Sequence, residues 1–152
     1  MKKVEQFLTQ SSEHMEAALS RARVVISCQD LELRYLWLFN PAKEFRHVLG
    51  KKMSDFLTEE QYGPIDKLKR EVIAKREPVQ RQIQVPYRGQ ICTYDMTVTP
   101  TFHDGEMVGI TTVSVDLTDL LAAQEELHKA NARLLGLLGD AVMAGKTVIR
   151  NI

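Results

Sequence analysis

The chain has 152 residues, enough for one domain with a proper core and a helical extension or two, but short for two independent folds. Twenty Lys and Arg balance twenty Asp and Glu, so the basic surface that draws a protein to nucleic acid is not expected. No stretch approaches the roughly 18 apolar residues of a membrane span, and Cys28 and Cys92 lack CxxC spacing. We expect a cytoplasmic chain, free or cut from a membrane-anchored parent, without a zinc site or disulfides.

The first 22 residues carry apolar side chains three, four and seven positions apart, the spacing of one helical stripe. The stripe consists of Val4, Phe7, Leu8, Met15, Ala18, Leu19 and Ala22. We predict an amphipathic helix that ends near residues 21–23. The segments "VVISCQ" and "RYLWLF" follow and predict two strands of an antiparallel hairpin, because both are short and rich in β-branched or aromatic residues.

The second of these strands is apolar on both faces. Strand alternation places Leu36 and Leu38 on one face and Tyr35, Trp37 and Phe39 on the other. A sheet that is apolar on both sides needs two covers, and the N-terminal helix is a candidate for one of them. An Asn-Pro pair ends the strand, because proline cannot donate to the sheet.

A helical middle segment and three further strands are predicted next. Short helical pieces should close at Gly50 and Gly63, and a longer helix should run from Pro64 to about Lys75, because proline suits the first turn of a helix. Alternating apolar residues at 78–87, 91–100 and 107–116 predict strands, with turns at "YRGQ" and "HDGE" between them. The order is one helix, two strands, the helical middle and three strands.

After Asp116 the apolar period changes to alternating steps of three and four. The residues concerned are Leu120, Ala123, Leu127, Ala130, Leu134, Leu137, Ala141 and Ala144. They predict a helix at 118–144 with a coiled-coil seam about three heptads long. Its alanines make the seam thin, so we expect a partner to stabilise it. Residues 145–152 form a tail without a usable pattern.

Three segments, in this order, resemble the PAS domain. "LRYLWLFNPA" is similar to the second PAS strand with its terminal Asn-Pro-Ala, "HVLGKKMSDFL" resembles the following turn and helix, and "DGEMVGITTVSVDLTD" is similar to the last PAS hairpin. The resemblance covers about residues 22–119. The sequence of the second strand most resembles that of PAS domains of bacterial sensor histidine kinases, especially those of the HWE type.

The resemblance implies an α+β PAS fold with a five-stranded antiparallel sheet. The PAS domain would span 23–117, between an N-terminal flanking helix at 1–22 and a C-terminal signalling helix at 118–144. A GAF-type domain, with six strands, fits less well because the helical run after the second strand is short. In the family the sheet packs its inner face on the helical middle and its outer face on a flanking helix or a partner subunit.

The implied function is that of a homodimeric sensor module that relays a change in its core to a downstream effector or kinase domain. The outer cover and dimer seam would comprise Tyr35, Trp37, Phe39, Leu120, Leu127 and Leu134. Asp116 and Thr118 would form the relay into the output helix, with Thr118 as its cap. Two alternatives remain: a small-molecule sensor, with haem as one candidate, and a stand-alone interaction domain without ligand.

Catalysis and cofactors find little support in the sequence. Kinase chemistry needs glycine-rich phosphate loops, which this chain lacks, so we do not expect an enzyme. His128 fits a solvated helix position better than a phosphorylation site. A flavin photosensor is disfavoured because "TEEQYGPIDKLK" lacks the adduct-forming cysteine of that class. Haem is disfavoured because none of the histidines, at 14, 47, 103 and 128, falls on "PIDKLKREVIAK".

A core or cavity is expected between the inner sheet face and the middle helices. Its expected lining comprises Leu36, Leu38, Phe56, Leu68, Val72, Ile83, Val85, Tyr94, Met96, Ile110, Thr112 and Ser114. Most such sets belong to a filled core, which we favour over a ligand pocket. The hydroxyls of Tyr94, Thr112 and Ser114 could orient a small ligand, so a pocket stays open as an alternative.

Overall fold

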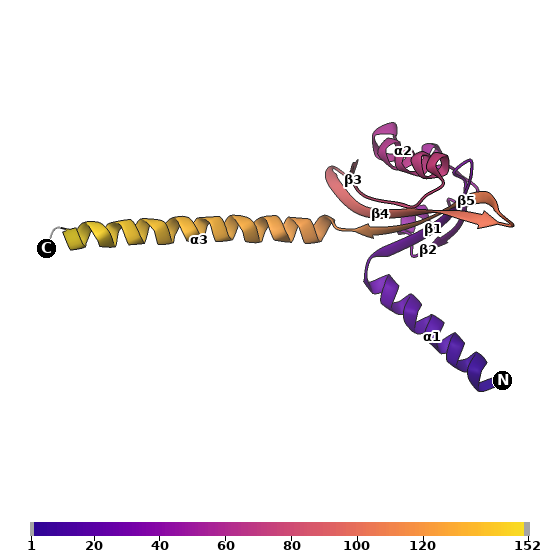
Figure 1. Cartoon of the computed structure of the whole chain (residues 1–152), viewed down its shortest axis with the longest axis horizontal. Helices are drawn as coiled ribbons and strands as arrows, with labels where there is room; N and C mark the ends of the chain where they lie inside the picture. Colours follow the sequence, from indigo (N-terminus) through magenta and orange to yellow (C-terminus); the bar gives the residue numbers. More distant parts are fainter. Residues whose placement is uncertain (1, 151–152) are drawn as a thin grey trace. The chain divides into compact units, whose positions relative to one another are not determined.

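A computed structural model describes residues 2–150, with side chains through residue 143. Five strands form one antiparallel sheet in the order β2-β1-β5-β4-β3 (Figure 1). Their bounds are β1 (Val24–Asp30), β2 (Tyr35–Phe39), β3 (Val79–Tyr87), β4 (Gln90–His103) and β5 (Glu106–Asp116). The predicted strands and the α+β class are confirmed. The first and last strands of the chain lie side by side near the centre of the sheet.

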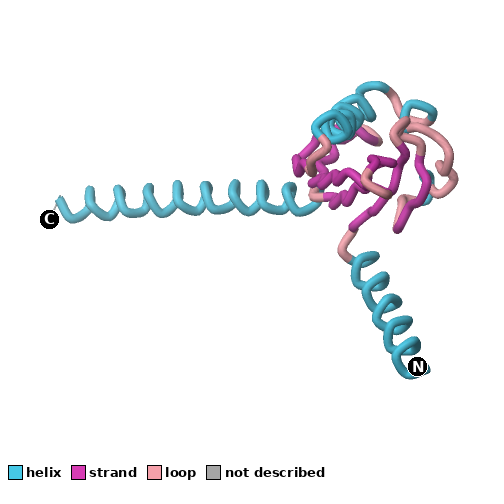
Figure 2. Tube along the Cα trace, turned by 45° about the vertical axis from the view of Figure 1, so that its right-hand side comes forward, coloured by secondary structure: helices cyan, strands magenta, loops and turns pink. Residues whose placement is uncertain are grey.

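The helical middle consists of η1 (Lys43–Phe45), η2 (Met53–Asp55) and α2 (Glu59–Lys75), which cover one side of the strands (Figure 2). The predicted break at Gly63 and start at Pro64 are wrong. The helix begins earlier because the Thr58 N–H donates a hydrogen bond to Gln61 Oε1 at 3.0 Å, the return half of a capping box. Pro64 lies inside the helix near its N-terminal end, where it removes one backbone donor.

The core is the layer between α2 and the inner face of the sheet. Its buried apolar members are Leu33, Tyr35, Val48, Met53, Ile65, Leu68, Val72, Ile83, Val85, Met96, Val98 and Ile110. Outside this layer, Arg81 Nη1 of β3 lies 2.8 Å from Glu71 Oε2 of α2. The hydrogen bond from Arg81 lowers the pKa of Glu71 to about 2, so this carboxylate is ionised at neutral pH.

An irregularity in the pairing of β1 with β2 reverses two predicted orientations. Trp37 pairs with Cys28, but Tyr35 pairs with Gln29, so one extra residue stands in β2. Tyr35, predicted to face outward, is therefore buried with 9% of its surface exposed, whereas Leu36, predicted to line the core, is 60% exposed. The rings of Trp37 and Phe39 stack 6.4 Å apart on the other face, as alternation predicts.

The N-terminal helix α1 (Lys2–Arg21) ends where the apolar stripe predicts. None of its described residues is buried, so the idea that it covers the outer sheet face of its own chain gains no support. Trp37 on that face is 49% exposed, and Phe7 of the helix is 67% exposed. Within one chain, both apolar surfaces are left without a cover.

The helix α3 (Thr118–Arg150) forms a compact unit separate from residues 1–117. It continues beyond the predicted end at 144, so the tail boundary is wrong for residues 145–150, while 151–152 lie outside the described residues. No proline interrupts it, although Gly136, Gly139 and Gly145 lie within it. The seam residues Leu120, Leu127 and Leu134 are exposed. In the described part of the chain, no helix combines the length and apolarity of a membrane span.

Gly109 of β5 permits the close approach of β1. A Cβ atom added there would lie 2.0 Å from the Gln29 carbonyl oxygen, so the backbone would have to shift. We expect Gly109→Ala to lower the free energy of unfolding by about 1–3 kcal/mol, as overpacking commonly does. Gly136→Ala in the interior of α3 is the control: outside its chain neighbours and the backbone of its own helix, no described atom lies within 4 Å of the added Cβ, and we expect no loss of stability because alanine favours the helix. Urea denaturation that ranked the two variants equally would contradict this account.

Candidate functional site

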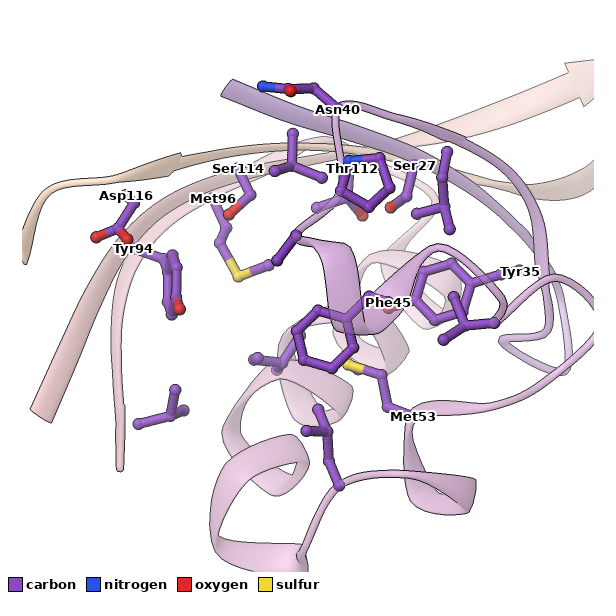
Figure 3. Close-up of a pocket in the computed structure, with 18 of the residues that line it drawn as sticks. Ser27, Tyr35, Asn40, Phe45, Met53, Tyr94, Met96, Thr112, Ser114 and Asp116 are labelled. Carbon is purple, nitrogen blue, oxygen red and sulfur yellow. The ribbon is translucent and has the colours of Figure 1, made fainter. Parts of the chain in front are cut away.

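A cavity of about 490 Å³ lies between the inner sheet face and the helical middle (Figure 3). All five strands reach its lining or its rim. The sheet contributes Val25, Ser27, Tyr35, Leu38, Val85, Tyr87, Tyr94, Met96, Thr112, Ser114 and Asp116, and the middle segment contributes Phe45, Val48, Met53, Phe56, Leu57, Gln61, Ile65 and Lys69. This volume falls within the range of about 300–1,000 Å³ typical of small-molecule sites.

Apart from the exposed Leu36, the predicted lining residues divide into two groups. Leu38, Phe56, Val85, Tyr94, Met96, Thr112 and Ser114 line the cavity, whereas Leu68, Val72, Ile83 and Ile110 pack in the solid core beside it. The favoured interpretation of a wholly filled core is therefore wrong. Short hydroxyl side chains on the two central strands, Ser27, Thr112 and Ser114, leave space opposite Phe45 and Met53 (Figure 3).

Sequence reasoning missed Lys69, which lines the cavity with 1% of its surface exposed. A signal was present: Lys69 stands four residues after Ile65 and three before Val72, on the apolar stripe of α2. Its charge argued against burial. Ser27 and Tyr35 were also missed, Ser27 because β1 was read only for its β-branched residues and Tyr35 because of the irregular pairing in β2.

The polar groups gather at two ends of the cavity. Ser27 pairs across strands with Thr112, and Tyr35 lies farther along the same direction, so these form one end. Lys69 belongs to this end because its Nζ lies 5.3 Å from the centre of the Tyr35 ring. All four side chains are buried. We call this set, Ser27, Tyr35, Lys69 and Thr112, the buried polar end.

The opposite end is more open. Tyr94 pairs with Asp116 across β4 and β5, and both are partly exposed. The exposed residues Ser20 and Arg23 complete the rim there. Burial raises the pKa of Tyr94, with the Cys92 and Asp116 side chains adding to the effect, so its hydroxyl stays protonated at neutral pH.

Lys69 is a buried cation without an ion-pair partner. No carboxylate oxygen of the described residues lies within 4 Å of its Nζ, and its recorded contact is the Tyr35 ring. Burial lowers the pKa of Lys69 from 10.5 to about 8, although the nearby Asp66 carboxylate opposes the shift. Thr112 Oγ1 is also buried and has no hydrogen-bond partner among the described residues. Burial raises the pKa of Tyr35, which keeps its hydroxyl a donor.

The open end of the cavity contains a residue that lies close in sequence to the first residue of α3. Asp116 lines the cavity and stands two residues before Thr118, the first residue of α3. The Leu117 N–H donates to the Thr93 carbonyl oxygen at 2.8 Å, and the Asp116 N–H approaches the Arg23 carbonyl oxygen at 3.5 Å. The end of β5 is therefore joined both to β4 and to the segment that precedes β1.

The cavity lining can be compared with the residues that flavin-adduct and haem sites require. Neither of the two cysteines and none of the four histidines is among the lining residues. Among the described residues, no three His, Cys, Asp or Glu side chains are grouped so that they could hold a metal ion. What the cavity does present is an apolar wall, a buried ammonium group and several hydroxyls, which suits binding of a small organic molecule.

Comparison with known proteins agrees with this architecture. A family model described as PAS fold matches residues 14–122. Probable histidine kinase 1 of Oryza sativa subsp. indica is 29% identical over 138 residues, covering 86% of this chain and 14% of that protein. Histidine kinase 5 of Arabidopsis thaliana is 29% identical over 133 residues, covering 82% of this chain and 14% of that protein.

Solved structures agree on the fold. The PAS domain from Bordetella pertussis BvgS is 21% identical, with a TM-score of 0.52, and the similarity covers 82% of this chain and 98% of that chain.

The chain spans only 14% of the length of each of the two histidine kinases. The finer resemblance to kinases of the HWE type stays a prediction.

Replacing Lys69 tests whether its charge is held at the expense of stability. We expect Lys69→Met to raise the free energy of unfolding at pH 7 by about 3 kcal/mol, because each unit of pKa shift corresponds to about 1.4 kcal/mol. The burial penalty applies fully below pH 8, declines as the folded protein loses the proton, and vanishes above about pH 10.5, so the gain should follow that course.

Lys67→Met, at an exposed position of the same helix, is the control and should change stability by less than about 0.5 kcal/mol. Denaturant titrations of the three proteins at pH 7 and 9 give the comparison. A loss of stability in Lys69→Met at pH 7 would mean that the lysine supports the fold.

Proposed function

Because the chain belongs to the PAS family, we propose that it is the cytoplasmic sensor module of a two-component signalling protein, passing a change in the cavity to α3. The observation that carries the proposal is the position of Asp116, which lines the cavity and stands two residues before the helix. An effector such as a histidine kinase domain would follow α3. Residues of this chain would bind the ligand and transmit the resulting change to α3, and the effector would carry out catalysis.

In this proposal, a change in the cavity is transmitted along β5 to α3. Thr112, Ser114 and Asp116 all line the cavity from this one strand, which leads into α3 with a single residue between them. A ligand that pushes or pulls on these side chains acts on a strand that pairs with β1 on one side and β4 on the other. Only a ligand with unequal affinity for two arrangements of β5 could shift their populations.

A parallel homodimer would provide the covers that one chain lacks. In one chain, Trp37 and the leucine seam of α3 are exposed, Phe39 is partly exposed, and no described residue of α1 is buried. A two-fold axis parallel to α3 would pair each seam with itself and bring both output helices to one effector. Ala141 belongs to the same seam, whereas the side chain of Ala144 lies outside the described ones.

A second function, that of a stand-alone interaction domain, is favoured by the same exposed surfaces. It predicts dimerisation through α3 and the outer sheet face without any bound ligand. The cavity distinguishes the two functions, because an interaction domain needs no buried ammonium group in an open interior. Native mass spectrometry of the full chain separates them, since it reports the subunit number and any co-purified small molecule together.

The junction residues test the relay. In a fusion of the chain to a histidine kinase domain, we expect Asp116→Ala with Thr118→Ala to abolish regulation of autophosphorylation while the thermal unfolding midpoint of the PAS unit changes little. The expected reason is that Asp116 no longer joins the cavity lining to the end of β5, and that Thr118 loses its side-chain oxygen in the first turn of α3. The control, Asp95→Ala with Thr97→Ala on β4, should regulate normally. Normal regulation in the junction variant would contradict the proposal that the signal passes through Asp116 and Thr118.

Substitutions in the leucine seam of α3 test whether the chain forms the proposed homodimer. We expect Leu127→Lys with Leu134→Lys to weaken self-association at least tenfold, because two like charges would meet in the apolar seam. Gln124→Lys with Asn131→Lys adds the same charge off the seam and should leave association within about threefold. Sedimentation equilibrium of the full chain measures both. A wild-type chain that stays monomeric at micromolar concentration, or equal effects of the two pairs, would contradict the arrangement.

A further inference from the structure

We propose that the cavity binds a small carboxylate with an apolar body, and that Lys69 and Thr112 hold the carboxylate group at the buried polar end. The inference deepens the proposed sensor function and rests on it. It names the chemical class of the signal, which neither the family nor the fold specifies.

The buried ammonium group of Lys69 has no carboxylate in direct contact. A buried ammonium group is normally paired with a carboxylate, because transferring an isolated charge out of water is unfavourable. Lys69 is 1% exposed, and no described carboxylate oxygen lies within 4 Å of Nζ. The Tyr35 ring, 5.3 Å away, offers only the weaker attraction between a cation and a π system. An anion in the cavity would complete the pair.

Three hydroxyl groups lie at the same end of the cavity as Lys69. Thr112 Oγ1 is buried, lines the cavity and has no partner among the described residues, so its hydroxyl is available to a ligand. Ser27 lies directly across from Thr112 on β1, and the Tyr35 hydroxyl points into the same space (Figure 3). One ammonium group and three hydroxyls match the two oxygens of a carboxylate, which accept about four hydrogen bonds.

The charges of the cavity also fix the direction of the ligand. The acidic side chain in the lining, Asp116, belongs to the open end together with Tyr94, and the register of β1, β4 and β5 separates it from Thr112. At the open end a ligand carboxylate would meet the acidic Asp116 and the basic Arg23 together, whereas at the buried end it meets the cationic Lys69 with no acidic lining residue beside it. The head group therefore enters first, and the rest of the molecule extends toward the rim.

An apolar body fits the space between the two ends. Phe45 and Phe56 are in tilted contact with ring centres 5.5 Å apart on the helical side, and both line the cavity. Met53 of η2 lines the cavity on the same side and Met96 of β4 lines it from the sheet, and their flexible side chains can adjust to the shape of a ligand. A volume of about 490 Å³ accommodates a small aromatic or medium-chain aliphatic acid.

Binding should depend on pH through Lys69. The ligand carboxylate requires the charged amine, whose pKa in the empty cavity is about 8, so affinity should fall above that pH. Asp66 on the same helix and Tyr35 on β2 face the amine; burial raises the pKa of both, and Tyr35 stays neutral throughout the relevant range. Asp116, Tyr94 and Arg23 belong to the distant open end.

The test compares acids with their primary amides, which keep the shape and remove the charge. The probes are 3-phenylpropionate, indole-3-acetate and octanoate, each with its amide, titrated calorimetrically into the full chain at pH 7. We expect at least one acid to bind ten or more times tighter than its amide. Its affinity should fall about tenfold per pH unit above pH 8. Lys69→Met should abolish the preference, and the exposed control Lys67→Met should retain it.

The outcomes distinguish this inference from the sensor function. Equal or tighter binding of the amides, or a preference for acids that survives in Lys69→Met, overturns the carboxylate assignment and leaves ligand sensing intact. A neutral molecule that co-purifies with the chain and occupies the cavity does the same. If none of the six probes binds and native mass spectrometry finds no bound molecule, ligand sensing fails, and the carboxylate assignment fails with it.

Discussion

The pairing of β1 with β5 is the constraint on which the rest of the structure depends. It runs from Val24 opposite Val115 to Asp30 opposite Gly109 and joins the first and last strands of the chain. At one end only glycine fits beneath the Gln29 carbonyl, so the two strands approach closely. In the middle, small hydroxyl residues face inward and leave a cavity. At the other end, the chain departs into both flanking helices.

Stability and binding make opposite demands on this inner face. Residues such as Leu68, Val72 and Val98, which expose none of their surface, supply a filled core next to the cavity. A buried ammonium group and an unpartnered hydroxyl oppose folding, and apolar residues of similar size would stabilise the protein more. The placement of the polar groups at one end and of Asp116 at the other makes physical sense for a site that binds a polar head and reports to α3.

Strand alternation and helical periodicity were sufficient to predict the five strands, the flanking helices and most of the inward-facing residues, since these patterns are local. They failed at Tyr35 and Leu36 because the irregularity in β2 is set by its pairing with β1, which the pattern of β2 does not contain. They failed at Lys69 because its position on the apolar stripe of α2 indicates burial, whereas its charge indicates exposure. They could not distinguish a filled core from a cavity, because the distance between two layers depends on every side chain between them.

The central claim is that occupancy of the cavity is felt where β5 becomes α3. The amide of Leu117, which donates to the Thr93 carbonyl oxygen at 2.8 Å, reports on that place directly. Its hydrogen-exchange rate should be measured by NMR in the wild-type chain and in Ser27→Leu, a substitution that fills the cavity from β1. We predict that filling the cavity changes exchange at Leu117 and leaves Glu106, at the turn between β4 and β5, unchanged, because neither Glu106 nor its partner His103 lines the cavity. An unchanged Leu117 amide in a folded variant with a filled cavity would contradict the account.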